Sequence, residues 1–169
     1  SEFVYNSAFM MKPIFEQAKS DPKRIAYAEG EDLRVLRAVQ IAVDDGLAIP
    51  ILVGRPAVIE ANIKKLGLRL EDGVNITIVD QEKNPNYEMF ADDYYNIMQR
   101  KGVTPEYAQR EARRRSTLIA AMLVKHGMAD GMLCGTYSSY DIHLDFVSNI
   151  IGKKDGHNTF FTLNALMLE

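Results

Sequence analysis

The stretch that decides the fold is residues 24–39, RIAYAEGEDLRVLRAV. Its apolar opening, residues 25–28, is typical of a buried strand, and an acidic glycine turn follows at residues 29–32. Apolar side chains then recur at three- and four-residue spacing from Leu33 to Val39, which predicts a helix with one face on a core. A strand, a tight turn and a helix form the first half of a βαβ unit. Turns of this kind lie at the carboxyl edge of the sheet, where α/β proteins bind ligands.

Two arginines lie at the beginning of this predicted helix. Arg34 and Arg37 are three residues apart, so their side chains leave the helix on roughly the same side. Two guanidinium groups beside a helix N-terminus suit a phosphate or a carboxylate. The alternative is a solvated helix face on which the arginines pair with Glu31 and Asp32, and spacing alone favours this alternative slightly.

The rest of the chain repeats the alternation of strand and helix. We predict an α/β fold in which a mainly parallel sheet is covered by helices on both faces. Strands are expected at residues 25–28, 49–53, 74–79, 132–134 and 160–168. Helices are expected within residues 2–20 (one helix, or two around Pro13), from Leu33 to a glycine cap at Gly46, at 56–66 and 86–101, from Pro105 onward (capped by Thr104), and at 118–125 (capped by Ser116) and 140–151.

A parallel sheet brings the turns after its strands to one edge. The turns at residues 29–34, 54–56 and 135–140 should therefore open into a shared cleft. The loop from Thr136 to Ser139 contains Ser138 as well, and its hydroxyl and backbone N–H groups could face an anion. A serine that caps the following helix explains the same residues equally well.

Composition excludes several classes of function. The chain has 169 residues, enough for one domain with a proper core, and its net charge of −3 gives no electrostatic case for binding nucleic acid or an anionic membrane. No apolar run approaches the ~20 residues of a membrane-spanning helix. No signal peptide is visible, and the single cysteine, Cys134, is expected to be a small buried side chain in a reducing compartment, so we expect a cytoplasmic protein.

Sequence motifs for common cofactors and metals are absent or weak. Neither of the two common glycine-rich nucleotide fingerprints occurs. Asp141, His143 and Asp145 form a D-x-H-x-D motif, but side chains two residues apart diverge on a helix, so we predict no metal site there. His126 is expected at a helix end, on the surface or as a cap. The chain begins at Ser1 and ends directly after an apolar stretch, as a segment of a longer polypeptide would.

Four segments together resemble a known family. They are residues 23–67 (KRIAYAEGEDLRVLRAVQIAVDDGLAIPILVGRPAVIEANIKKLG), 73–80 (GVNITIVD), 100–104 (RKGVT) and 129–136 (ADGMLCGT). They are similar to the amino-terminal half of phosphate acetyltransferases, and more closely to the phosphotransacetylase-like carboxyl-terminal region of bacterial NADP-dependent malic enzymes. The resemblance implies a three-layer α/β/α lobe like that of isocitrate and isopropylmalate dehydrogenases. It divides the chain into a linker helix from an upstream malic enzyme domain (1–22), a first lobe (23–157) and the truncated start of a second (158–169).

The resemblance also implies a ligand and a regulatory role. Family members use arginines to hold the anions of coenzyme A and phosphate, and Arg34 matches one of them. Two others align with Met98 and Asp145, where the positive charge is lost or reversed, so acetyl transfer is not expected and no catalytic residue is assigned. The implied effector is acetyl-CoA or another acyl-CoA, held by Arg34, Arg37, Thr136, Ser138 and Ser139.

The implied parent is a homo-oligomeric malic enzyme that uses NADP and Mg or Mn in its upstream domain, whereas this segment itself carries no cofactor or metal. Two alternatives remain open. One is an active phosphate acetyltransferase, and the other is a purely structural oligomerisation module.

Overall fold

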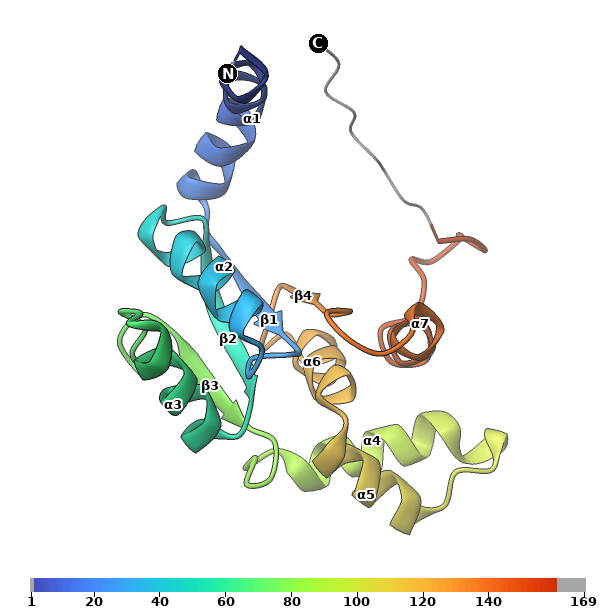
Figure 1. The fold of residues 1–169 in the computed structure, drawn as a ribbon. Coiled ribbons are helices and arrows are strands. Elements are labelled where there is room, and N and C mark those ends of the chain that lie inside the picture. The colour runs from blue at the N-terminus through green and yellow to red at the C-terminus, as the bar shows by residue number, and fades with distance from the viewer. Residues whose placement is uncertain (1, 161–169) are drawn as a thin grey trace.

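The computed structural model describes residues 2–160, and the side chains from residue 11 onward. Four strands and seven α-helices alternate along the chain, with one short 3₁₀ helix (Figure 1). The strands are β1 (Lys23–Tyr27), β2 (Ala48–Gly54), β3 (Thr77–Asp80) and β4 (Gly131–Leu133). The helices are α1 (Glu2–Ser20), α2 (Leu33–Asp44), α3 (Pro56–Leu66), α4 (Tyr87–Met98), the 3₁₀ helix η1 (Gln99–Lys101), α5 (Pro105–Arg114), α6 (Ser116–Lys125) and α7 (Tyr140–Ile150).

The four strands form one parallel sheet in the order β3-β2-β1-β4. Residues Lys23 to Tyr27 of β1 pair with Ala48 to Leu52 of β2, and the shorter β4 pairs with β1 on the other side. The predicted α/β class and the parallel sheet are therefore confirmed. Because all strands run the same way, their carboxyl ends meet at a single edge.

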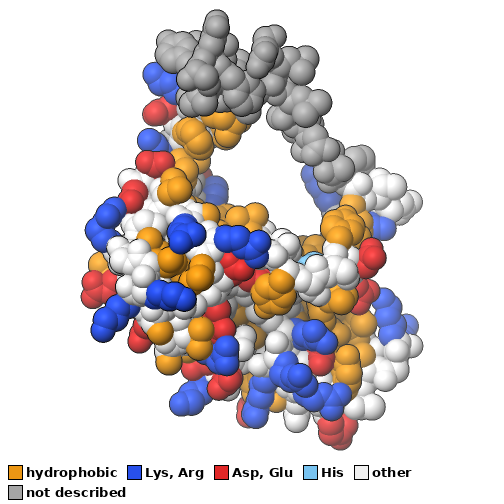
Figure 2. Space-filling view, in the orientation of Figure 1, with side chains coloured by type: hydrophobic (Ala, Val, Ile, Leu, Met, Phe, Trp, Pro, Cys, Tyr) orange, Lys and Arg blue, Asp and Glu red, His pale blue; other side chains and the backbone are white. Residues whose placement is uncertain are grey.

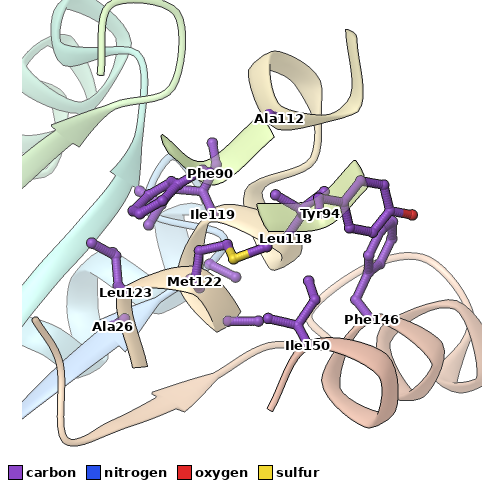
Figure 3. Close-up of a cluster of buried hydrophobic side chains, with 14 of the residues drawn as sticks. Ala26, Phe90, Tyr94, Ala112, Leu118, Ile119, Met122, Leu123, Phe146 and Ile150 are labelled. Atoms are coloured by element: carbon purple, nitrogen blue, oxygen red, sulfur yellow. The ribbon is translucent and has the colours of Figure 1, made fainter. Parts of the chain in front are cut away.

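The alternation of side chains along the strands separates two cores. Ala26 and Ala28 of the first strand segment belong to a buried cluster with α4, α5, α6 and α7, whereas Tyr27 lies in a second cluster with α2 and α3. Successive side chains of a strand point to opposite faces, so the sheet is covered on both faces and forms three layers. Figure 3 shows the larger cluster, in which Phe90, Leu118 and Phe146 come from α4, α6 and α7.

Two predicted element boundaries are wrong for local reasons. The third strand begins at Thr77 rather than at residue 74, because residues 73–75 turn: Gly73 has φ of 75°, and Asn75 Oδ1 accepts a hydrogen bond from Glu71 N at 2.8 Å. Ser116 is the first residue of α6 rather than its cap, and the N-cap is Arg115. Thr104 caps α5 as predicted, accepting a hydrogen bond from Tyr107 N.

The N-terminal helix of the described residues lies away from the sheet. Helix α1 is continuous through Pro13 and extends away from the other elements, and its residues Ile14 and Phe15 are exposed (Figure 1). Apart from Phe160, which is not in a strand, the predicted strand at 160–168 lies outside the described residues. No helix in residues 2–160 is long and apolar enough to cross a membrane.

Candidate functional site

The turns that follow β1, β2 and β4 meet at the carboxyl edge of the sheet, as predicted. Gly30 N donates to Val53 O at 3.1 Å, which joins the first turn to the second. Gly135 N donates to a carboxylate oxygen of Glu29 at 3.0 Å, which joins the first turn to the third. We call residues 28–34, 53–55 and 134–139 together the carboxyl-edge site.

Arg34 lies between two of these turns. Its Nε and Nη2 donate to the Asp32 carboxylate at 3.1 and 2.8 Å, and Nη2 also donates to Thr136 O at 3.1 Å. The same carboxylate caps α2 by accepting from Arg34 N, and these hydrogen bonds lower the pKa of Asp32 to about 2. The Arg34 side chain is 68% exposed, and its Nη1 makes no hydrogen bond within the described residues. Arg34 can therefore contact a solvent-borne anion through that nitrogen.

Arg55 is a second guanidinium at this edge, and the sequence analysis did not single it out. Its Nε and Nη2 donate to the Glu31 carboxylate at 2.9 and 2.7 Å, and its backbone N–H donates to the same group at 2.8 Å. The hydrogen bond from the Arg55 side chain lowers the pKa of Glu31 more than burial raises it. The predicted pairing of Arg34 with acidic turn residues is thus correct for Asp32, whereas Glu31 takes a different partner.

A cavity of about 400 Å³ opens between the turns. Charged groups dominate its lining, which includes the carboxylates of Glu29, Glu31 and Asp32 and the guanidinium groups of Arg55 and Arg114. Arg114, near the end of α5, makes no ion pair within the described part of the chain. On the wider surface, acidic and basic side chains lie side by side over most of the face in Figure 2. The cavity thus carries more carboxylates than guanidinium groups.

The hydroxyl groups of the loop from Thr136 to Ser139 differ in whether they are free to bind a ligand. Thr136 Oγ1 donates its hydrogen to Glu29 at 3.3 Å, so this hydroxyl has only lone pairs left to offer a ligand. Ser138 and Ser139 are exposed; Ser139 is the N-cap of α7, as the alternative interpretation held, but its side chain makes no capping hydrogen bond. Ser138 has φ of 71°, in the left-handed region. Among the described residues, the loop's hydroxyl donors without a hydrogen-bond partner are therefore those of Ser138, Ser139 and Tyr137.

Arg37 lies one turn after Arg34 on α2. Its side chain is exposed on α2, without a hydrogen bond or ion pair in the described region. Met98 is 7% exposed within the larger apolar cluster, and Asp145 is exposed on α7, where it accepts a hydrogen bond from Asn149. Neither of the two positions carries a charge that could attract an anion.

Cys134 and His143 differ in burial. The expectation that Cys134 is a buried side chain is wrong, because β4 is a three-residue edge strand that ends before it. His143, in contrast, is 8% exposed and makes hydrogen bonds with Thr117 and Tyr137. Among residues 2–160 no three His, Cys, Asp or Glu side chains lie close enough together to hold a metal ion. His126 is the C-cap residue of α6, and its Nε2 lies 2.8 Å from Asp93.

The chain is similar to a family of phosphate acetyl/butaryl transferases and to a region of malic enzymes. The sequence model of the phosphate acetyl/butaryl transferase family matches residues 9–169. The NADP-dependent malic enzyme of Salmonella typhimurium is 47% identical over 99% of this chain, and the phosphate acetyltransferase of Clostridium acetobutylicum is 35% identical over 75%. The chain covers 22% of the former and 37% of the latter. A phosphotransacetylase structure from Streptococcus pyogenes superposes with a TM-score of 0.77 at 25% identity, covering 88% of this chain and 45% of that one.

Proposed function

The chain belongs to the phosphate acetyl/butaryl transferase family, and on that premise we propose that it is the regulatory, non-catalytic region of a malic enzyme. The parent enzyme would oxidatively decarboxylate malate to pyruvate with NADP and Mg or Mn, in a part of the protein outside this chain. This region would bind acetyl-CoA, or a related acyl-CoA, as an effector at the carboxyl-edge site. It would also contribute to a homo-oligomer.

The observation that carries this proposal is the difference between the two groups of relatives. Identity to the Salmonella malic enzyme is 47% over nearly the whole chain, whereas identity to the Clostridium phosphate acetyltransferase is 35% over three quarters of it. The chain covers only about a fifth of the malic enzyme, at 22%. Such a segment is suited to modulating an activity that resides elsewhere in the protein.

The charges at the carboxyl edge support binding over phosphate chemistry. An enzyme that transfers an acetyl group to phosphate must attract a phosphate ion with unpaired cations. Here both Arg34 and Arg55 are paired with carboxylates, and the buried Glu29 adds a third negative group to the cavity, so Arg114 is the one guanidinium of its lining without an ion pair among the described residues. A carboxylate about 4 Å from a phosphate costs roughly 1 kcal/mol in bulk water and more where water is excluded. This arrangement disfavours inorganic phosphate as a substrate.

A larger anionic ligand can still bind through Arg34. Its exposed Nη1 and the Ser138 and Ser139 hydroxyls are available to one phosphate group of coenzyme A, while the rest of the molecule provides affinity through other contacts. We leave Arg37 out of this contact set, because its exposed side chain makes no hydrogen bond or ion pair with the loop among the described residues.

The test uses the full-length protein and the variant Arg34→Ala. A matched control is Arg69→Ala, since Arg69 makes an equally short ion pair at 2.8 Å, with Asp44, and is 74% exposed but lies outside the carboxyl-edge site. We expect Arg34→Ala to raise the dissociation constant of acetyl-CoA by about ten- to a hundredfold, as the loss of a hydrogen bond to a charged group does. Arg69→Ala should leave it unchanged.

Isothermal titration calorimetry gives the dissociation constant, and NADPH formation from malate gives the response to the effector. Equal dissociation constants for the two variants would remove Arg34 from the site. Synthesis of acetyl phosphate from acetyl-CoA and phosphate would support the active transferase instead. If acetyl-CoA gave no heat of binding and no change in malate turnover, the remaining hypothesis would be the purely structural oligomerisation module.

A further inference from the structure

The loop between β4 and α7 is hydrogen-bonded to a buried carboxylate. Glu29, at the end of β1, is 4% exposed, and its two oxygens accept hydrogen bonds from Gly135 N at 3.0 Å and from Thr136 Oγ1 at 3.3 Å. Burying a carboxylate is costly unless its oxygens are hydrogen-bonded. Both of these hydrogen bonds go to the loop, so the position of the loop and the burial of Glu29 depend on each other.

A buried histidine holds the next residue of the loop. Nε2 of His143 lies 2.7 Å from Tyr137 O, and a carbonyl can only accept, so Nε2 carries the hydrogen and donates it. In the neutral ring Nδ1 is then an acceptor, and Thr117 Oγ1, at 2.9 Å, donates to it. Glu29 Oε1 is 3.9 Å from the same Nε2, beyond hydrogen-bond distance. Thr117 is 6% exposed in the first turn of α6. Its hydroxyl therefore helps to hold the ring with Nε2 facing the loop.

The loop needs such support because it contains a strained residue. Ser138 has φ of 71°, in the left-handed region, which is energetically unfavourable for a non-glycine residue. Strained backbone of this kind persists only where the surrounding structure fixes it. Each of the three preceding residues is fixed: Gly135 and Thr136 by Glu29, Thr136 also by Arg34, and Tyr137 by His143.

We infer that Glu29, His143 and Thr117 are positioning residues that set the conformation of the loop at residues 134–139 and thereby the geometry of the effector site. They come from the turn after β1, from α7 and from α6, and α6 packs against both β1 and α7 (Figure 1). The inference rests on the proposed function in treating this loop as part of the acyl-CoA site. The network itself consists of contacts within the chain and requires no ligand.

Thr117 offers a pair of substitutions that separates the hydroxyl from packing. Thr117→Val keeps the shape of the side chain and removes the donor to His143, whereas Thr117→Ser keeps the donor and removes a methyl group. In the full-length protein without ligand, we expect Thr117→Val to speed amide exchange in the peptide covering residues 134–139 by about tenfold, the effect of one lost hydrogen bond. Thr117→Ser should exchange at nearly the original rate. Thr104→Val is the control, because it removes a threonine hydroxyl that caps α5 by accepting from Tyr107 N, outside the loop.

Acetyl-CoA titration of the same variants gives the second measurement. Weaker binding in Thr117→Val, restored in Thr117→Ser, supports the positioning role. Faster exchange in Thr117→Val, in a protein that binds no acetyl-CoA in any form, supports control of the loop and rejects the proposed function alone. Unchanged amide exchange in Thr117→Val would overturn the inference. A larger effect in Thr117→Ser than in Thr117→Val would also overturn it, because a role in packing alone predicts that order.

Discussion

Asp32 has two roles that a single substitution can separate. Its carboxylate accepts hydrogen bonds from the backbone N–H groups of Arg34 and Val35, at 2.7 and 3.4 Å, and so caps α2. The same carboxylate pairs with the Arg34 guanidinium. Asparagine is as good an N-cap residue as aspartate, so Asp32→Asn keeps the first role and removes the charge. Asp32→Ala removes both.

The two variants should differ in stability. Loss of an N-cap side chain costs about 1 kcal/mol, and an exposed ion pair contributes ~0.2–1 kcal/mol. Because the Arg34 side chain is 68% exposed, the lower part of that second range applies. We expect urea unfolding at pH 7 to show a loss of roughly 0.5 kcal/mol for Asp32→Asn and about 1.5 kcal/mol for Asp32→Ala.

The charge of Asp32 should also limit the affinity for anions. In Asp32→Asn the Arg34 guanidinium no longer forms an ion pair with a carboxylate of the protein itself. At the distances across a guanidinium group, in a solvated setting, the gain is below about 1 kcal/mol, which corresponds to two- to fivefold tighter binding of acetyl-CoA. Calorimetry measures this change. Weaker binding in Asp32→Asn would refute the reasoning, since it would mean that the carboxylate orients Arg34 for the ligand more than it competes with it.

The dependence of the free energy of unfolding on pH, in the acidic range, gives an independent test of this ion pair. Hydrogen bonds from Arg34 lower the pKa of Asp32 from 3.8 to about 2. A carboxyl group whose pKa is lowered by folding contributes stability above its unfolded pKa, and this contribution is lost as the pH falls through the folded pKa. Asp32→Asn should therefore lose less stability than the original protein between about pH 4 and pH 2. Parallel curves over this range would contradict the assigned ion pair.

Other substitutions test the turns and an ion pair elsewhere in the fold. Gly30→Ala should destabilise the fold and disturb the first turn, because a Cβ there would lie 2.8 Å from Val53 O; thermal unfolding measures the loss. Ser138→Gly should keep or raise the melting temperature by relieving the backbone, whereas Ser138→Val should lower it, and equal effects would argue against the strain. The pKa of Asp130 is also lowered to about 2, by Arg24, so Asp130→Asn should flatten the acid limb between about pH 4 and pH 2 without changing acetyl-CoA affinity, which calorimetry checks.

The fold could be predicted from the sequence because each element carries its own periodic signal. The β1 strand, the acidic turn and the spacing of apolar residues in α2 are all local features, and the structure has them as predicted. The start of β3 was misplaced because Val74 looks like a strand residue although the turn at Gly73 includes it. The burial of Cys134 was misjudged because its sequence neighbours are apolar, while the length of β4 is decided by pairing with β1.

The sequence predicted that the site lies at the carboxyl edge of the sheet, but it did not predict which side chains pair there. Sequence alone indicated that three turns meet there, and Arg34 does lie among them. The choice of Arg55 as the partner of Glu31 depends on a contact between residues 24 positions apart, for which no local pattern exists. The same holds for Glu29, whose partners in the loop are 106 and 107 residues away. Such pairings depend on the sheet order, which periodicity does not reveal.

The acidic turn therefore serves the fold and limits the chemistry at the same time. Asp32 caps α2, Glu31 fixes the turn after β2, and Glu29 holds the loop after β4. Each of these structural roles places a negative charge beside the edge where an anion would bind. Removing a carboxylate to favour phosphate would therefore loosen the turns that form the site. On the proposed function, we therefore expect weak binding of a small phosphate at this edge and tighter binding of a large ligand that needs a single cation there.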